Sequence, residues 1–117
     1  MRGCDILNHM VQYSSDLTSA FAAVSDPTRR GILEQLGHGN ATISELAGRF
    51  AMTLTGIKKH VAVLEDAGLL VSTKVGRVRT CTLGDRRLDE EAAWLQRYQQ
   101  MVEARFRKLD QLLDEID

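Results

Sequence analysis

The stretch over residues 42–70 constrains the fold more than any other part of the chain. It predicts two short helices joined by a tight turn, the second of them over residues 53–67. Apolar side chains at spacings of three and four share one face of this second helix: Leu54, Ile57, Val61 and Leu64. The other face carries small, hydroxyl and cationic side chains: Thr55, Lys58, Lys59 and Ala62, with His60 at its edge. A helix anchored on one side and polar on the other suits insertion into the major groove of DNA.

A β-hairpin is expected directly after this helix. Residues 70–75 and 78–83 are rich in β-branched side chains, and Gly76-Arg77 between them predicts a two-residue turn. The hairpin carries three cations: Lys74, Arg77 and Arg79. At the tip, Arg77 suits entry into a minor groove, and an ordinary exposed turn residue is the alternative. Two helices, a tight turn and a basic hairpin are typical of a winged helix-turn-helix.

The residues before this stretch predict further helices with recognisable starts. Residues 16–24 have helical spacing, and Asp26 followed by Pro27 suits the N-cap and first position of the next helix. Thr42 and Glu45 have the spacing of a capping box, which opens a short helix. In the later helix, the expected N-cap is Thr53 and the expected C-terminal stop is Gly68.

One long helix is expected over residues 88–116. Apolar side chains recur along it at alternating spacings of four and three, and only Gln99 interrupts the stripe. A helix of about 29 residues extends roughly 43 Å, more than a domain of this size can cover with its own core. A sustained heptad favours pairing with a second copy, and intramolecular packing is the alternative. The expected dimer-interface residues are Leu17, Phe21, Leu88, Leu95, Val102, Phe106, Leu109, Leu113 and Ile116.

The formal net charge of −1 conceals an uneven distribution. Residues 55–87 carry seven Lys/Arg and three Asp/Glu, which gives a net charge of +4. Residues 88–117 carry four basic and eight acidic side chains, which gives −4. This asymmetry is expected when one surface faces phosphate and another faces protein or water.

These patterns predict a mainly α fold with a small β-hairpin in one compact domain. Residues 1–15 are an N-terminal extension, residues 16–87 the winged helix-turn-helix, and residues 88–117 the dimerisation helix. No apolar run approaches the roughly 20 residues that span a bilayer, and no secretory signal is evident. Cys4 and Cys81 form no CxxC pair, so a reduced cytoplasmic compartment is expected.

Three motifs in order closely resemble the ArsR (arsenic-repressor-like) family of bacterial winged-helix regulators. They are Asp26-Pro27-Thr28-Arg29-Arg30 with Ile32, Leu33 and Leu36; Glu45-Leu46-Ala47; and Ile57-x-Lys59-His60-x-x-Val63-Leu64-x-x-Ala67-Gly68-Leu69. The resemblance covers roughly residues 16–85. It implies a homodimer that binds double-stranded operator DNA and is usually a repressor released by a signal. Lys58 departs from the family, whose members commonly carry a small hydroxyl residue there.

The two best-known metal sites of the family are missing from this sequence. Metal-sensing members place cysteines in the helix that corresponds to residues 44–50, and this segment contains none. Other members bind metal through Asp and His on the last helix, and residues 88–117 contain no histidine. No metal and no cofactor are therefore expected, and the effector is not specified.

The candidate DNA contacts combine the second helix and the hairpin: Thr53, Thr55, Gly56, Lys58, Lys59, His60, Lys74, Arg77 and Arg79. His60 has two alternatives, a packing or capping role and a phosphate contact. For Arg29 and Arg30, next to the helix start, a structural role is favoured over contact with the DNA backbone. Cys81 is interpreted as a small, partly buried strand residue, with a redox switch as the weaker alternative.

The expected function is sequence-specific DNA binding by a homodimeric transcriptional repressor of a pseudo-palindromic operator. The alternative is a winged helix that mediates protein–protein assembly, with DNA binding weak or absent. An enzyme is not expected, because no paired-carboxylate, Ser/His/Asp, glycine-rich phosphate-binding or metal-ligand pattern is present to carry chemistry.

Overall fold

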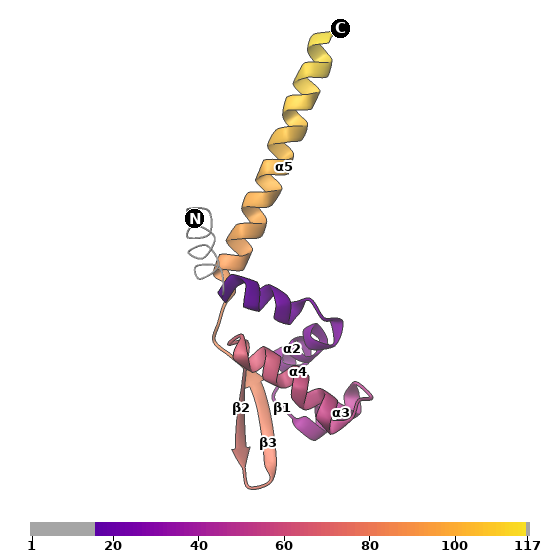
Figure 1. The fold of residues 1–117 in the computed structure, drawn as a ribbon, viewed down its shortest axis with the longest axis vertical. Coiled ribbons are helices and arrows are strands. Elements are labelled where there is room, and N and C mark those ends of the chain that lie inside the picture. The colour runs from indigo at the N-terminus through magenta and orange to yellow at the C-terminus, as the bar shows by residue number, and fades with distance from the viewer. Residues whose placement is uncertain (1–15, 117) are drawn as a thin grey trace, which may run out of the picture. The chain divides into compact units, whose positions relative to one another are not determined.

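The computed structural model describes residues 16–116, and the side chains of residues 16–115. It divides into two compact units, of which the first ends at Arg87 and the second begins at Leu88 (Figure 1). The predicted fold class is confirmed, since helices dominate and one small antiparallel sheet accompanies them.

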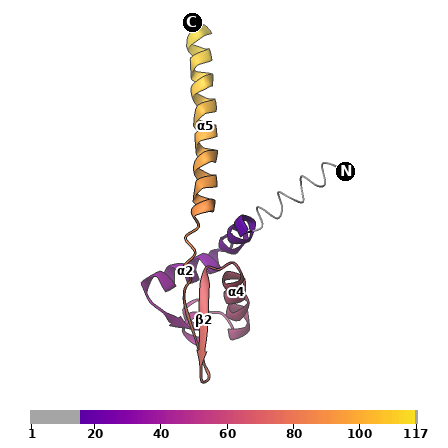
Figure 2. The same cartoon turned by 90° about the vertical axis from the view of Figure 1, so that its left-hand side faces the viewer.

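In the residues that the structure describes, the first unit contains four helices and a three-stranded sheet. Figures 1 and 2 show how these elements are arranged. Residues 16–24 form the first helix. The later elements are α2 (Pro27–His38), β1 (Ala41–Thr42), α3 (Ile43–Arg49), α4 (Leu54–Asp66), β2 (Leu70–Val75) and β3 (Val78–Leu83). The β2–β3 hairpin projects beyond the helices, which is the shape of a wing.

The predicted helix starts are confirmed. The Asp26 carboxylate accepts from the Arg29 backbone N–H at 3.0 Å, and proline occupies the first turn of α2. The capping box is complete, because the Thr42 hydroxyl and the Glu45 carboxylate each accept from the other residue's backbone N–H. At the start of α4, the Thr53 hydroxyl accepts from the Gly56 N–H at 3.0 Å. These bonds satisfy helix N–H groups that have no intrahelical partner.

The core of the first unit lies between the helices and the inner face of the sheet. Its largest fully buried side chains come from five different elements: Ile32, Leu46, Ile57, Leu64, Leu70 and Cys81. Burial raises the pKa of the Cys81 thiol, which keeps it in the unreactive neutral form. The interpretation of Cys81 as a packed strand residue is therefore favoured over the redox switch.

One predicted anchor of α4 is wrong. Ile57, Val61 and Leu64 are buried as expected, but Leu54 is 49% exposed. Leu54 lies in the first turn of α4, where its side chain lines an open groove instead of the core. Helical spacing places a residue on a face, but it does not fix how far the covering elements extend along that face.

The sheet has one strand more than the sequence predicted. Its order is β1-β3-β2, and the two-residue strand β1 pairs with β3 through Ala41↔Cys81 and Thr42↔Thr80. Two residues are too few to show the alternation that predicts a strand. The hairpin itself is confirmed, and Gly76 at its turn has φ 63°, as the first central residue of a type II′ turn requires.

The second unit is α5 (Asp89–Ile116). The predicted start at Leu88 is wrong by one residue, because Leu88 has φ 60° and contributes only its carbonyl, which accepts from the Ala92 N–H. Eight large apolar side chains of α5 are exposed: Trp94, Leu95, Tyr98, Met101, Phe106, Leu109, Leu112 and Leu113. No helix in the described part of the chain combines the length and apolar character needed to cross a membrane.

Candidate nucleic-acid interface

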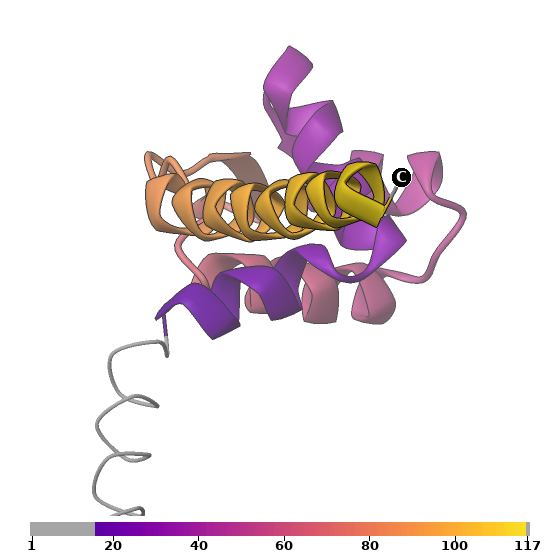
Figure 3. The same ribbon diagram turned by 90° about the horizontal axis from the view of Figure 1, so that it is seen from above.

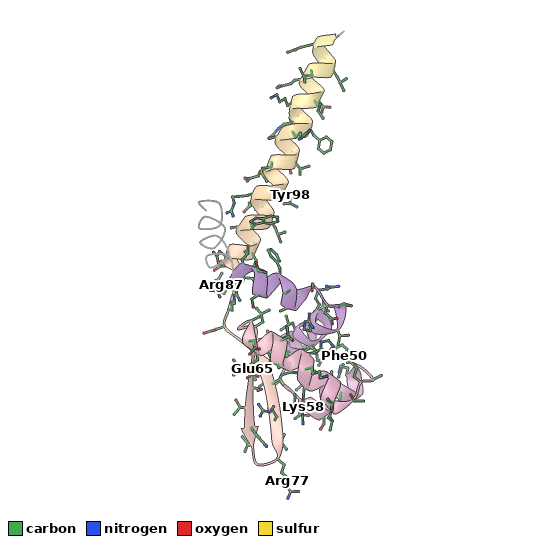
Figure 4. All side chains as sticks on the ribbon, in the orientation of Figure 1. Phe50, Lys58, Glu65, Arg77, Arg87 and Tyr98 are labelled. Atoms are coloured by element: carbon green, nitrogen blue, oxygen red, sulfur yellow. The ribbon has the colours of Figure 1, made fainter. Side chains whose placement is uncertain are left out.

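A groove of about 620 Å³ separates α4 from the β2–β3 hairpin. We call it the α4–hairpin groove. Its cationic lining residues are Lys58, Lys74, Arg77 and Arg79, and one carboxylate, Glu65, also lines it. Figure 4 shows Lys58 on α4 and Arg77 at the far end of the hairpin. The structure therefore brings four of the predicted DNA contacts, from two elements, to one concave surface.

The outer face of α4 is accessible along its N-terminal half. Thr53, Thr55, Lys58 and Lys59 are exposed, and Gly56 between them is half-buried. Because Ile57 is fully buried, the backbone of α4 is fixed against the core while these side chains extend outward. The small and hydroxyl residues at the N-terminal end of α4 leave room for a ligand to approach the helix backbone closely.

The hairpin presents its cations on the side of the groove. Lys74 and Arg79 are directly opposite one another in the β2–β3 register. Like charges at such positions repel each other, which costs stability unless an anion or another group balances them. Arg77 is exposed in the turn, where no neighbouring strand restricts its side chain.

A chain of hydrogen bonds joins the hairpin to α4. The Glu65 carboxylate accepts from the Ser72 hydroxyl at 2.9 Å and from the Ser72 N–H at 3.3 Å. The Arg79 guanidinium in turn donates to the Ser72 hydroxyl at 2.8 Å. Arg79 was predicted as a DNA contact, but one of its guanidinium nitrogens is hydrogen-bonded within the protein. The sequence did not indicate this connection, because no local pattern links Glu65 to a strand residue seven positions later.

His60 lies on a different side of α4 from the lysines. Its Nδ1 atom is 3.2 Å from the Arg29 guanidinium and 3.9 Å from the Asp26 carboxylate, and its side chain is only 20% exposed. These contacts favour the packing alternative over the phosphate contact. They also place Asp26 at a junction of two helices. Its pKa is lowered chiefly by the hydrogen bond from the Arg29 backbone N–H, and the nearby Arg29 charge also lowers it.

Arg29 and Arg30 both bind the C-terminal end of the first helix. Arg29 donates to the Ala23 carbonyl at 2.7 Å and to the Ala22 carbonyl at 3.0 Å. Arg30 donates to the Val24 carbonyl at 2.7 Å. Cations at a helix C-terminus satisfy free carbonyls and oppose the helix dipole, so the structure supports the structural role favoured for both residues.

The predicted dimer residues are placed on two elements. On α5, Leu95, Phe106, Leu109 and Leu113 are exposed and Val102 is half-buried; Leu88 precedes the helix, and the side chain of Ile116 lies outside the described part. On the first helix, Leu17 and Phe21 are half-buried. Trp94 and Tyr98 stack along α5 with ring centroids 5.8 Å apart. Cys4, His9 and the rest of the 1–15 extension lie outside the described residues.

The described residues contain no group of three or more His, Cys, Asp or Glu side chains placed to hold a metal ion. The absence of a metal or cofactor site stays a prediction.

Comparison with known proteins identifies the architecture. A helix-turn-helix domain family matches residues 24–73. The structure of the ArsR family transcriptional regulator RHA00566 is 43% identical, covers 78% of this chain and 94% of its own, and superposes with a TM-score of 0.71. An ArsR-like transcriptional regulator from Rhodococcus sp. RHA1 is 33% identical over 92% of this chain and 98% of its own, with a TM-score of 0.74. The chain belongs to the ArsR family of transcriptional regulators.

A functionally named relative agrees with this assignment. The transcriptional repressor SdpR of Bacillus subtilis is 29% identical over 79 residues, which are 68% of this chain and 88% of the relative. The family resemblance seen in the sequence is thus confirmed, and this ArsR-family protein is a transcriptional regulator with a helix-turn-helix domain. The relatives are regulators and not enzymes.

Proposed function

We propose that this ArsR-family regulator is a homodimeric repressor that binds a pseudo-palindromic operator through α4 and the β2–β3 hairpin. The observation that carries the proposal is the α4–hairpin groove, where cations from both elements converge. A basic concave surface beside an exposed helix suits the phosphate backbone at the edge of a major groove. Because such a protein works on DNA, its place is the cytoplasm, and it has no catalytic role.

The exposed face of α4 enters the major groove in this account. Thr55, Lys58 and Lys59 contact base edges and phosphates, while Thr53 and Gly56 allow the backbone to approach closely at the helix start. Lys74 and Arg77 extend the contact from the hairpin, and Arg77 at the tip reaches the neighbouring minor groove. Arg79 contributes charge from its place beside Ser72.

Homodimer formation rests on α5. Three residues of its apolar stripe are largely exposed in a single chain, with Leu95 at 50%, Phe106 at 63% and Leu113 at 62%. Burial of such side chains contributes about 1.5–3 kcal/mol each, so a second copy supplies the missing cover. Two copies would place two α4 helices in successive major grooves about 34 Å apart.

Repression is proposed from the relatives. SdpR is named a transcriptional repressor, and the present chain spans 88% of that protein. A regulator that carries one DNA-binding unit and one dimerisation helix can repress by occupying the operator. No effector is assigned.

The test is a fluorescence anisotropy titration of the full chain against DNA from its own upstream region, over a range of salt concentrations. Lys59→Ala with Arg77→Ala should weaken binding strongly and lower the salt slope by about 1 for each phosphate interaction that the substitutions remove. The matched control, Arg105→Ala with Lys108→Ala, removes the same charge from α5 and should bind as the wild type does. Weak binding that both double variants leave unaltered would instead support the protein–protein assembly alternative.

A further inference from the structure

Arg29 joins two helices that both bear on DNA recognition. Its Nε and one terminal nitrogen donate to the carbonyls of Ala23 and Ala22, which end the first helix. Its other terminal nitrogen lies 3.2 Å from Nδ1 of His60 on α4. Figure 3, seen from above, shows the first helix lying over α4, and Figure 1 agrees. One guanidinium therefore spans from the end of one helix to the middle of the other.

The chemistry of this contact defines which group donates. A guanidinium has only donors, so a hydrogen bond at this contact runs from Arg29 to Nδ1 of His60. The Asp26 carboxylate lies 3.9 Å from the same Nδ1 and accepts from the Arg29 backbone N–H. Arg29 is thus held at its backbone by the N-cap of α2 and at its side chain by two other helices. A planar, multiply bonded group of this kind fixes geometry better than a single flexible contact.

We propose that Arg29 is a positioning residue for DNA recognition, which sets the placement of α4 against the first helix through His60. Arg29 acts by fixing the position of α4, and it does not itself contact phosphate. The inference rests on the proposed function, since it concerns how α4 is presented to the major groove.

This link also gives dimerisation a route to α4. The first helix carries Leu17 and Phe21, which we assign to the dimer interface, and its C-terminal carbonyls are the acceptors for Arg29. A shift of the first helix on pairing moves the guanidinium, and the guanidinium moves His60. Such a chain of bonded groups between rigid elements is the kind of physical connection that couples two sites.

Arg30 provides a matched control in the same helix. Its guanidinium donates to the next carbonyl of the first helix, at Val24, and not to a residue of α4. Arg29→Lys and Arg30→Lys each keep the positive charge and remove the planar fork. Affinity is measured by anisotropy for a site selected in vitro with the wild type and for a scrambled duplex. Salt slopes and urea denaturation are recorded for each variant.

Arg29→Lys should lower affinity for the selected site by about tenfold, with the salt slope and the affinity for scrambled DNA unchanged. Arg30→Lys should stay within about twofold of the wild type on both duplexes. Arg29→Gln, which also removes the charge, should leave the salt slope unchanged; a slope that falls by about 1 would make Arg29 a phosphate contact and overturn the proposal. Wild-type affinity of Arg29→Lys for the selected site would overturn it as well.

A second pair of variants carries the test if Arg29→Lys does not fold. His60→Gln keeps an acceptor for the guanidinium, whereas His60→Phe keeps ring volume without one. His60→Phe should lose about tenfold in specific affinity at an unchanged salt slope, and His60→Gln should retain most of it. Where Arg29→Lys does fold, the double variant with His60→Phe should lose little more affinity than either single variant, as for partners in one contact. Additive losses, or equal binding by His60→Phe and wild type, would contradict the proposal.

The two proposals fail in different ways. A wild-type chain that binds no DNA at any salt concentration overturns the proposed function itself. A wild type that binds specifically, beside an Arg29→Lys variant that binds equally well, overturns only the role of Arg29.

Discussion

The helices α4 and α5 have similar amphipathic sequences and opposite surroundings. On α4, Ile57 and Leu64 are completely buried, while on α5 Leu95 and Leu113 are 50% and 62% exposed. Both stripes follow the same spacings of three and four. The difference shows that spacing predicts a helix and its apolar face, whereas the element that covers the face depends on the rest of the fold.

The contrast assigns different tasks to the two helices. Since its apolar side is covered within the first unit, α4 can present its polar side to a ligand in a fixed orientation. In a single chain α5 presents its apolar side uncovered, which is unfavourable in water and favours association. We therefore place DNA recognition on α4 and dimer formation on α5, and the following predictions test this division.

The largest effect is expected in the core. Leu64→Ala should lower the free energy of unfolding by about 2–5 kcal/mol, because a fully buried leucine leaves a cavity. Leu109→Ala on α5 is the matched variant. Its loss of free energy of unfolding should grow with protein concentration, because more of the protein is then dimeric. Urea denaturation at several concentrations measures both. If both variants lost the same free energy of unfolding at every protein concentration, the contrast between α4 and α5 would be contradicted.

Dimer disruption should give the next largest effect. Phe106→Glu puts a carboxylate in the exposed apolar stripe, and desolvating that charge at an interface should dissociate the dimer. Affinity for a two-half-site operator should fall by about 100-fold, because each copy then binds alone. Sedimentation velocity and anisotropy report the two changes. Gln100→Glu, which adds the same charge outside the stripe, is the control and should remain dimeric.

A smaller effect is expected at the junction of the hairpin with α4. Glu65→Ala removes the acceptor for Ser72, so Arg79 loses its support. Specific affinity should fall by about fivefold, as expected for the removal of a hydrogen bond to a charged group. Affinity for scrambled DNA should rise slightly, since a carboxylate leaves the groove. A parallel rise in both affinities would show that Glu65 only repels phosphate and does not position the hairpin.

The smallest effect is an acid-dependent one at Asp26. The bond from the Arg29 backbone lowers the pKa of Asp26 below its ordinary 3.8. A lowered pKa means that the carboxylate stabilises the fold above about pH 3.8 and that this contribution disappears as pH falls through the folded-state pKa. Asp26→Asn keeps a helix cap and should flatten the loss of stability in acid. An equally steep loss of stability in acid for Asp26→Asn and the wild type, measured by thermal melting, would contradict this assignment.

The sequence predicted the parts of the fold that local chemistry determines. The capping box at Thr42 and Glu45, the proline-led start of α2 and the Gly76 turn are all set by bonds or dihedral angles within a few residues. Strand β1 was missed because it has only two residues and because its partner Cys81 lies forty positions away in the sequence. Such short, distant pairs leave no periodic pattern.

The candidate interface divides in the same way. Lys58 and Arg77 were placed from helix and hairpin geometry alone, and the structure brings both to the α4–hairpin groove. The environments of Leu54, His60 and Arg79 were not predictable, because each depends on a neighbour from another element. For His60 this neighbour is Arg29, thirty-one positions earlier. Tertiary contacts thus separate the residues that we propose to face DNA from those that hold α4 in place.

The most direct test of the central claim is hydroxyl-radical footprinting of the wild-type chain on a site selected in vitro. If α4 recognises DNA and α5 pairs two copies, two protected half-sites should appear, related by approximate two-fold symmetry and about 10 base pairs apart. Phe106→Glu should reduce protection of both half-sites together. A single protected half-site, bound by one chain with the same affinity in wild type and Phe106→Glu, would contradict the account.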